Sequence, residues 1–269
     1  MPGETKATLA RSLGVARSTL YYAKKLPRKD WVLKQRIEAV LHEHPSYGAR
    51  RLEIALGTSK RRIKRVMRRY GIKPYRRRPK KSWCKASSDI PAVPNLLASV
   101  TPDRPDVAWA SDFTHLTFRG RTLYIATVMD VWTREIVGLC LLTNHSVHLV
   151  IAALADALRQ GRRPVILHSD QGSEYRSKPY RQYAERFTIR LSMSRKSSPW
   201  ENGYQESFYS QFKLDLGDPN RFGSLGELVA ALYETIRVYN TTRIHTALKM
   251  PPAVFAARYV TVQEVLSRL

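Results

Sequence analysis

The sequence predicts an α/β fold, a mixed β-sheet flanked by helices, preceded by small all-α units. Three strand-like runs follow one another over residues 106–143, and helical and strand-like segments alternate from residue 146 onward. Successive strands followed by this alternation give a mixed sheet with helices on its faces. Residues 1–73 show only short amphipathic helical patterns, which predict separate helical units ahead of the sheet.

The chain is strongly basic. Its 269 residues carry 46 Lys/Arg and 22 Asp/Glu, a net charge of +24, and residues 1–100 hold +19 of it. A polyanion is therefore the expected partner. No stretch approaches the roughly 18 apolar residues that indicate a membrane span, and the N-terminus has no apolar core of a signal peptide. We expect a protein that stays in the cytoplasm and binds no membrane.

Residues 1–28 have the pattern of a helix-turn-helix. Leu9 and Leu13 are expected to face inward, and Gly14 permits a tight turn. Ser18 comes early in the second helix, where recognition helices present short polar side chains to bases. A helical hairpin that only packs against its neighbours gives the same pattern and is the alternative.

Residues 29–73 predict a second helical DNA-binding unit. The apolar spacing gives three helices, over residues 30–44, 48–56 and 60–70. Thr58 and Ser59 are candidate caps of the third helix, and Gly71 is the expected end.

A run of basic residues covers the third helix and continues beyond it. Residues 60–81 contain thirteen Lys and Arg and no acid. Like charges at this density repel each other and gain free energy on a phosphate backbone through counterion release. A solvated helix face is the alternative. The predicted DNA contacts in this run are Arg61, Arg62, Arg65, Arg68, Arg69, Arg76, Arg77 and Arg78.

The α/β domain is expected over residues 106–250, after a basic, proline-rich linker at 74–105. The first three strands should form an antiparallel meander with Gly120 at its first turn. Helices at 146–160, 176–187 and 199–213 then alternate with strands at 164–170 and 188–194. Residues 251–269 form a helical tail.

Three acids of this domain are candidates for catalysis. Asp112 lies in the first strand, in the run SDFTH. Asp170 ends the run PVILHSD, at a strand carboxyl end, where α/β sheets place their sites. Glu206 lies inside the helical run PWENGYQESFYSQFK, with 35 residues between it and Asp170.

These motifs, in this order, carry a specific resemblance. SDFTH, then HSDQGSEY, then SPWENGYQESFYSQFK resemble the ribonuclease-H-like integrase core of DDE transposases and retroviral integrases. With YGARRL, RRIKRVMRRYGI and VYNTTRIHTALKMPPAVF, nearly the whole chain resembles the second-frame product of the insertion-sequence-three family of transposases.

The resemblance implies a metal-dependent enzyme that cleaves the 3′ ends of an insertion sequence and joins them to DNA. Two Mg²⁺ ions, for which Mn²⁺ can substitute, are implied, with Asp112 bridging both ions, Asp170 on one and Glu206 on the other. The chemistry is consistent: hard oxygen ligands suit magnesium, and two divalent cations can clamp the attacking and leaving oxygens of phosphoryl transfer.

Two basic segments near these acids are predicted to hold DNA. Lys213 lies seven positions after Glu206, two helical turns along one face. It should meet the phosphate backbone or the terminal base, and a solvated helix lysine is the alternative. Arg195 and Lys196 lie in the approach to that helix, a candidate loop over the active site.

Polar residues around the acids are expected to support them. His168 lies two positions before Asp170 on the same strand face, where it could orient a metal ligand, and Asn202 is expected in a similar role. Glu174 and Glu201 are interpreted as surface or supporting acids. A later polar cluster is typical of the resembling family and is interpreted as a brace of the domain's end; it comprises Asn240, Arg243 and His245.

The implied partner is double-stranded DNA, both the element ends and the target. A homo-oligomer on DNA is expected, with an upstream-frame protein fused by frameshifting or associated, acting at the bacterial nucleoid. Two alternatives remain at this point: a non-catalytic DNA-binding regulator derived from a transposase, and a ribonuclease-H-type nuclease. Metal-dependent nicking of an element end separates the first from a transposase, and digestion of an RNA–DNA hybrid without end specificity would favour the second.

Overall fold

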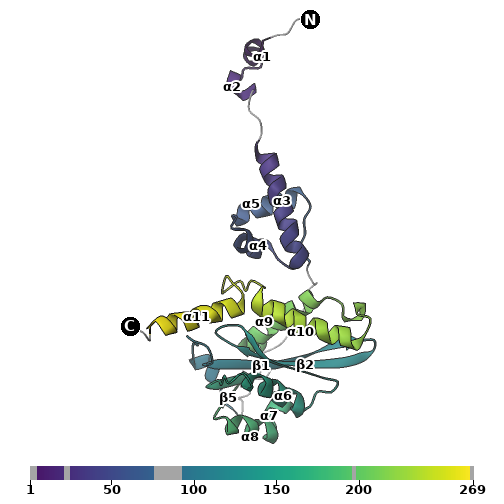
Figure 1. The fold of residues 1–269 in the computed structure, drawn as a ribbon, viewed down its shortest axis with the longest axis vertical. Coiled ribbons are helices and arrows are strands. Elements are labelled where there is room, and N and C mark those ends of the chain that lie inside the picture. Colours follow the sequence, from purple (N-terminus) through teal and green to yellow (C-terminus); the bar gives the residue numbers. More distant parts are fainter. Residues whose placement is uncertain (1–4, 21–24, 76–92, 196–197, 267–269) are drawn as a thin grey trace.

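The structure, a computed structural model, describes residues 5–20, 25–75, 93–195 and 198–266. A five-stranded mixed sheet has helices on both faces, and the N-terminal helices extend from one side of it (Figure 1). This is the α/β class that the sequence predicts. No helix within the described ranges is long and apolar enough to cross a membrane.

The sheet is built from the predicted meander and two later strands. Its strands are β1 (Ala108–Phe118), β2 (Arg121–Asp130), β3 (Ile136–Leu142), β4 (Ile166–Ser169) and β5 (Arg190–Met193), in the order β3-β2-β1-β4-β5. The first three pair antiparallel, whereas β4 pairs parallel with β1 and β5 with β4. Gly120 adopts φ +77° at the first turn, a conformation that costs glycine little. The antiparallel meander is therefore confirmed.

Alternating side chains of β1 divide the core into two layers. Trp109 belongs to a cluster with α6 (Val147–Leu158) and α8 (Lys178–Arg186), which cover one face together with the short α7 (Ser173–Arg176). Leu116 belongs to a cluster with α9 (Gly203–Leu216) and α10 (Leu225–Thr241) on the opposite face. Gly138 of β3 lies so close to α6 that a Cβ there would meet the Ala153 carbonyl oxygen at 2.3 Å.

The N-terminal helices are α1 (Lys6–Ser12), α2 (Arg17–Leu20), α3 (Lys25–Glu43), α4 (Ala49–Leu56) and α5 (Lys60–Arg69). Leu9 and Leu13 are exposed, so the expectation that they face inward is wrong. Helices α3 to α5 share a core that includes Ile37, Leu52 and Ile63. Helix α3 begins earlier than predicted and continues across the expected boundary at residues 28 and 29. Ser59 is the N-cap of α5 but makes no side-chain capping bond.

Part of the predicted linker packs on the sheet. The 3₁₀ helix η1 (Leu96–Ser99) lies in it, and Leu96, Leu97 and Val100 pack on buried residues of β1 and β4. These apolar side chains gain free energy by leaving water, so this segment lies against the α/β domain. Two further 3₁₀ helices are η2 (Pro199–Asn202) and η3 (Pro219–Arg221), and the C-terminal helix is α11 (Pro252–Leu266).

The unit formed by α3 to α5 contacts the α/β domain through specific bonds. The Tyr47 hydroxyl accepts from the Ile244 N–H at 2.7 Å, and Arg51 Nε donates to the Ile244 carbonyl at 3.1 Å. The Ser46 hydroxyl donates to Asp215 of α9 at 2.6 Å. Ile244 also packs against the core of the helical unit. The helical unit is thereby held beside α9 and the segment after α10.

Candidate active site

Asp112 lies in the middle of β1, on the sheet face that α9 covers. Its register partner on β2 is Thr127, whose side chain bonds with α9 residues. Asp112 Oδ1 accepts a hydrogen bond from the Phe113 N–H at 2.8 Å. The strand therefore fixes this carboxylate between the sheet and the helix.

Asp170 lies beside Asp112 because of strand pairing. Ala110 of β1 is the register partner of His168 on β4, and Asp112 and Asp170 each lie two residues further along, on the same face. The Gly172 N–H donates to Asp170 Oδ1 at 2.9 Å. Loss of solvation raises the pKa of Asp170, and the charge of Glu174 raises it further.

The charges of the other two predicted acids act on Asp112. Its pKa is raised to about 7, chiefly by burial and also by the negative charges of Asp170 and Glu206. The Phe113 N–H and the charge of Lys213 act in the opposite direction. A carboxyl with this pKa is partly protonated at neutral pH. A bound cation would relieve the repulsion among the three acids.

Two neighbours of Glu206 on α9 anchor this helix to the sheet. Gln205 is fully buried and donates through Nε2 to the Ala110 carbonyl at 2.6 Å. The Tyr209 hydroxyl donates to the carbonyl of Asp112 itself at 2.7 Å. Glu206 is exposed in the first turn of α9, where the helix dipole favours a negative charge. This anchoring role was not predicted. The only signal for it in the sequence is the i, i+4 spacing of the two polar residues, which does not show that their side of the helix is buried.

The donor chemistry of this site fits a divalent cation. Three carboxylates offer the hard oxygen ligands that Mg²⁺ prefers, and the desolvated Asp112 lies within reach of the other two charges. Over the described residues, however, no three His, Cys, Asp or Glu side chains are already arranged to hold an ion. The acids therefore share an electrostatic environment without forming a finished coordination sphere.

His168 and Asn202 lie on the side of the site toward η1 and η2. His168 is buried and its Nδ1 bonds with the Ser192 hydroxyl at 2.8 Å. That hydroxyl also accepts from the Leu96 N–H, so His168 takes part in holding η1 on the sheet. Burial lowers the pKa of His168 to about 4. Asn202 is buried at the start of α9, and a supporting role of either residue toward a metal ligand stays a prediction.

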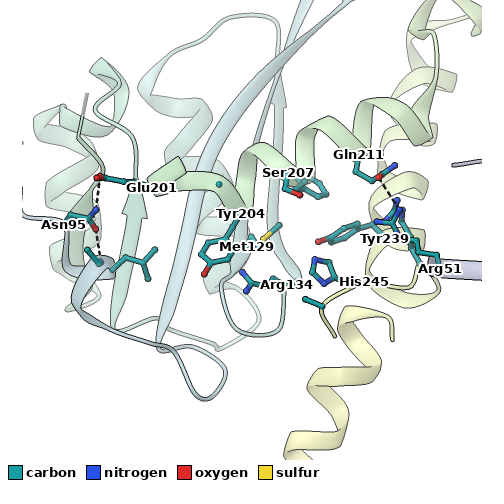
Figure 2. A pocket seen from close by; sticks show the side chains of 16 residues that line it. Arg51, Asn95, Met129, Arg134, Glu201, Tyr204, Ser207, Gln211, Tyr239 and His245 are labelled. Atoms are coloured by element: carbon teal, nitrogen blue, oxygen red, sulfur yellow. Dashed lines mark hydrogen bonds between the residues drawn. The ribbon is translucent and has the colours of Figure 1, made fainter. Parts of the chain in front are cut away.

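Arg195 is engaged by Glu201. Its Nε lies 2.7 Å from Glu201 Oε1, and its backbone N–H donates to Oε2 at 2.7 Å. Asn95 donates to the same Oε2 at 2.9 Å (Figure 2). Glu201 therefore connects η2 to η1 and to the end of β5. It supports the loop between β5 and η2, in line with its interpretation as a supporting acid. Lys196 lies outside the described residues.

The predicted DNA contacts of α5 fall into two groups. Arg65 and Arg69 lie 2.5 and 3.5 Å from the buried carboxylate of Asp30, so they also stabilise the helical unit. Arg61 and Arg68 are exposed on α5. Arg62 donates to the Lys29 carbonyl at 3.3 Å, and Arg76, Arg77 and Arg78 lie outside the described residues.

Comparison with known proteins places this geometry in a family. Two integrase core domain families match the chain, one over residues 102–199 and one over residues 187–252. The 31 kDa protein of insertion element IS600 from Shigella sonnei is 30% identical, with 93% of this chain and 98% of that protein covered. The transposase of insertion sequence element IS904 from Lactococcus lactis is 31% identical, with 81% of this chain and 90% of that protein covered.

A solved structure gives the same fold. The simian T-cell lymphotropic virus intasome, in complex with the PP2A regulatory subunit B56 gamma, matches with a TM-score of 0.51 at 16% identity, covering 81% of this chain and 73% of that chain. The fold and the family matches define a polynucleotidyl transferase with a ribonuclease-H-like integrase core. The chain belongs to the insertion-sequence-three family of DDE transposases, and it is a DNA transposase with strand-transfer activity. The resemblance drawn from the motifs is confirmed.

Proposed function

We propose that Asp112, Asp170 and Glu206 are the catalytic acids of this transposase and that together they hold two divalent cations. The observation that supports this most strongly is the convergence of their charges. β1, the end of β4 and α9 each supply one carboxylate, and the charges of Asp170 and Glu206 act on the half-buried Asp112. Two negative charges beside a desolvated carboxyl cost free energy unless a cation neutralises them.

When bound, two divalent cations supply Lewis-acid stabilisation of the charge that develops in phosphoryl transfer. The chain's own residues prepare the site for them. Asp112 gives up its proton when its carboxylate takes a ligand role, because ligands must be deprotonated. Gln205 and Tyr209 keep α9, and with it Glu206, fixed against β1. Lys213, whose charge acts on Asp112, is placed to position a DNA phosphate near the acids.

We assign Mg²⁺ as the physiological ion, with Mn²⁺ able to substitute, because the donors are carboxylate oxygens. The substrate is double-stranded DNA at the element's 3′ ends and at the target. The helical units, with the exposed Arg61 and Arg68 among the predicted contacts, hold that DNA. The chain acts as a homo-oligomer in the bacterial cytoplasm at the nucleoid, with an upstream-frame protein fused to it or associated.

The experiment is to replace Asp170 by Asn and measure cleavage and joining of a duplex that carries the element's terminal repeat. We expect folding and DNA binding to be retained and joining to be lost, because transition-state stabilisation by metal ions is worth many kcal/mol. The matched control is Asp103→Asn, since Asp103 is largely exposed in the segment before β1. Joining by Asp170→Asn at near the wild-type rate would show that the assignment is wrong.

The two alternative functions are not favoured. A decayed, non-catalytic regulator would not need to keep two carboxylates whose charges act on the half-buried Asp112. A ribonuclease-H-type nuclease would not account for likeness to insertion-sequence proteins over about nine tenths of the chain.

A further inference from the structure

A second site lies on the other flank of α9. A cavity of about 630 Å³ is bordered by α4, η1, α9, α10 and the segment after α10 (Figure 2). On α9 its lining comprises Gly203, Tyr204, Ser207, Phe208 and Gln211. At about 100° per residue, this lining is centred roughly 140° around the helix axis from Glu206 and Lys213. The cavity is therefore separate from the three acids, although the same helix borders both.

The cavity gathers positive charge from distant parts of the chain. Arg51 comes from α4, Arg134 from the turn between β2 and β3, and Arg243 from the segment after α10. Asp215 forms an ion pair with one of these arginines, because its Oδ2 accepts from Arg243 Nε at 2.6 Å. The lining also holds Glu201, which is already bonded to Arg195 and Asn95. Positive charge is thus in excess.

Three nitrogen atoms in this lining are buried without a hydrogen-bond partner among the described residues. They are Arg134 Nη1, Arg243 Nη2 and His245 Nδ1. The Arg243 side chain is only 3% exposed. Leaving a buried polar group unpaired costs about 1–3 kcal/mol, more for a charged group. Three such groups around one cavity indicate an acceptor that the protein itself does not supply.

Stacking on Tyr204 positions the guanidinium of Arg134 for such an acceptor. The backbone of Arg134 has φ +64°, in the left-handed region, and its guanidinium carbon lies 3.8 Å from the centre of the Tyr204 ring. Stacking on a ring fixes the guanidinium plane and leaves its N–H edges free to donate. Figure 2 shows Arg134 and His245 next to each other, with Tyr204 beside Arg134.

The pKa of His245 reflects the same positive environment. Its pKa is lowered to about 4, chiefly by burial and also by the positive charges of Arg134, Arg51 and Arg243. A bound anion would oppose the effect of the arginines. The imidazole is therefore neutral at neutral pH, with one nitrogen able to donate.

We propose that this cavity binds a phosphodiester group of the DNA backbone, with Arg134, Arg243 and His245 donating to its oxygens. The inference rests on the proposed function, because it takes DNA as the substrate. Arg51 belongs to the helical unit that docks on α9, so the site lies where the DNA-binding helices meet the catalytic domain. A phosphate held here lies on a different flank of α9 from Glu206 and Lys213. The site therefore fixes the path of a strand whose end lies at Glu206 and Lys213.

The test uses the full-length protein with a chelator, so that binding is measured without cleavage or joining. The probe is a duplex of the element's terminal repeat, in which single phosphates are replaced by neutral methylphosphonates. We expect one position at which the replacement weakens binding by wild type but not by Arg134→Gln. Arg134→Gln should also reduce the slope of log affinity against log salt by about one. The same effect of every methylphosphonate in both proteins would overturn the proposal.

Two further variants and one further probe complete the test. Arg134→Lys should keep the salt slope and lose part of the affinity, because the charge remains and the fork geometry does not. Arg159→Gln removes one charge from an exposed arginine at the end of α6 and should change neither quantity. If inorganic phosphate raises the melting temperature of wild type at matched ionic strength while no methylphosphonate position couples to Arg134, the cavity holds a small phosphate and the DNA assignment is wrong. Since no joining is measured, failure here is distinct from failure of the Asp170→Asn experiment.

Discussion

Replacing Asp112 by Asn should stabilise the metal-free protein at neutral and alkaline pH while destroying its activity. The carboxyl of Asp112 has a pKa of about 7 in the fold, chiefly because of burial, against an ordinary value of 3.8. An ionised Asp112 therefore costs the folded state free energy that a neutral amide avoids. Asn keeps an oxygen that can accept from the Phe113 N–H, as Asp112 Oδ1 does.

The size and the sign follow from these two pKa values. Because the fold binds the proton more tightly than the unfolded chain, the free energy of unfolding of wild type falls as the pH rises from about 4 to about 7, and is level above that. The full difference corresponds to about 4 kcal/mol, at 1.36 kcal/mol for each tenfold change in the acid constant. This value is an upper bound because local relaxation lowers it. Asp112→Asn should thus match wild type near pH 4 and exceed it by up to about 4 kcal/mol at pH 8.

The assay is urea denaturation of both proteins between pH 4 and pH 8, with a chelator and then with Mg²⁺. Magnesium should stabilise wild type, as any ligand of the folded state does, and should stabilise Asp112→Asn far less. The exposed Asp103→Asn serves as control and should follow wild type at every pH. If Asp112→Asn is no more stable than wild type at pH 8 without metal, the electrostatic picture of this site is refuted.

Three further outcomes follow from the same contacts. Lys213→Ala should weaken binding of the DNA end and reduce transition-state stabilisation for joining by about 1–3 kcal/mol, whereas Lys213→Arg should keep the charge and part of the activity. A quantitative joining assay checks this, and full activity of Lys213→Ala would contradict it. Tyr209→Phe removes the hydroxyl that holds the Asp112 carbonyl and should lower the free energy of unfolding by about 1–3 kcal/mol; an unchanged denaturation midpoint would show that α9 is anchored otherwise. Replacing the exposed Arg61 and Arg68 by Ala should flatten the salt dependence of duplex binding by about two, at roughly 0.9 per phosphate contact; an unchanged slope would mean that both are only solvated.

The sheet and its acids were predictable because short-range signals determine them. The meander of β1, β2 and β3 follows from strand-like runs separated by a glycine turn. Asp112 and Asp170 come together because parallel pairing of β1 with β4 brings two neighbouring strands into register. The family resemblance supplied what spacing cannot, namely that Glu206 of a later helix joins them.

The missed features depend on contacts between distant residues. Nothing local shows that Leu96 and Leu97 of the predicted linker pack on the sheet, because a short apolar pair among prolines has no period. The bonds from Arg65 and Arg69 to Asp30 join α5 to α3, so a run of basic residues read alone suggests DNA contacts only. Gln205 was visible in the sequence, but its role required knowing that its side of α9 is buried on β1.

The cluster of Asn240, Arg243 and His245 shows how one motif can serve two purposes. Asn240 braces the domain as the sequence predicts, since its side chain accepts from the Ile136 N–H and donates to the Ile136 carbonyl, each at 2.9 Å. Arg243 and His245 differ, because each keeps a buried nitrogen with no partner in the described part of the chain. A brace needs no such unpaired donors, and burying them costs stability. A cost of this kind is accepted at functional sites, and we therefore assign the unpaired donors of this motif to the proposed phosphate site and its amide to the fold.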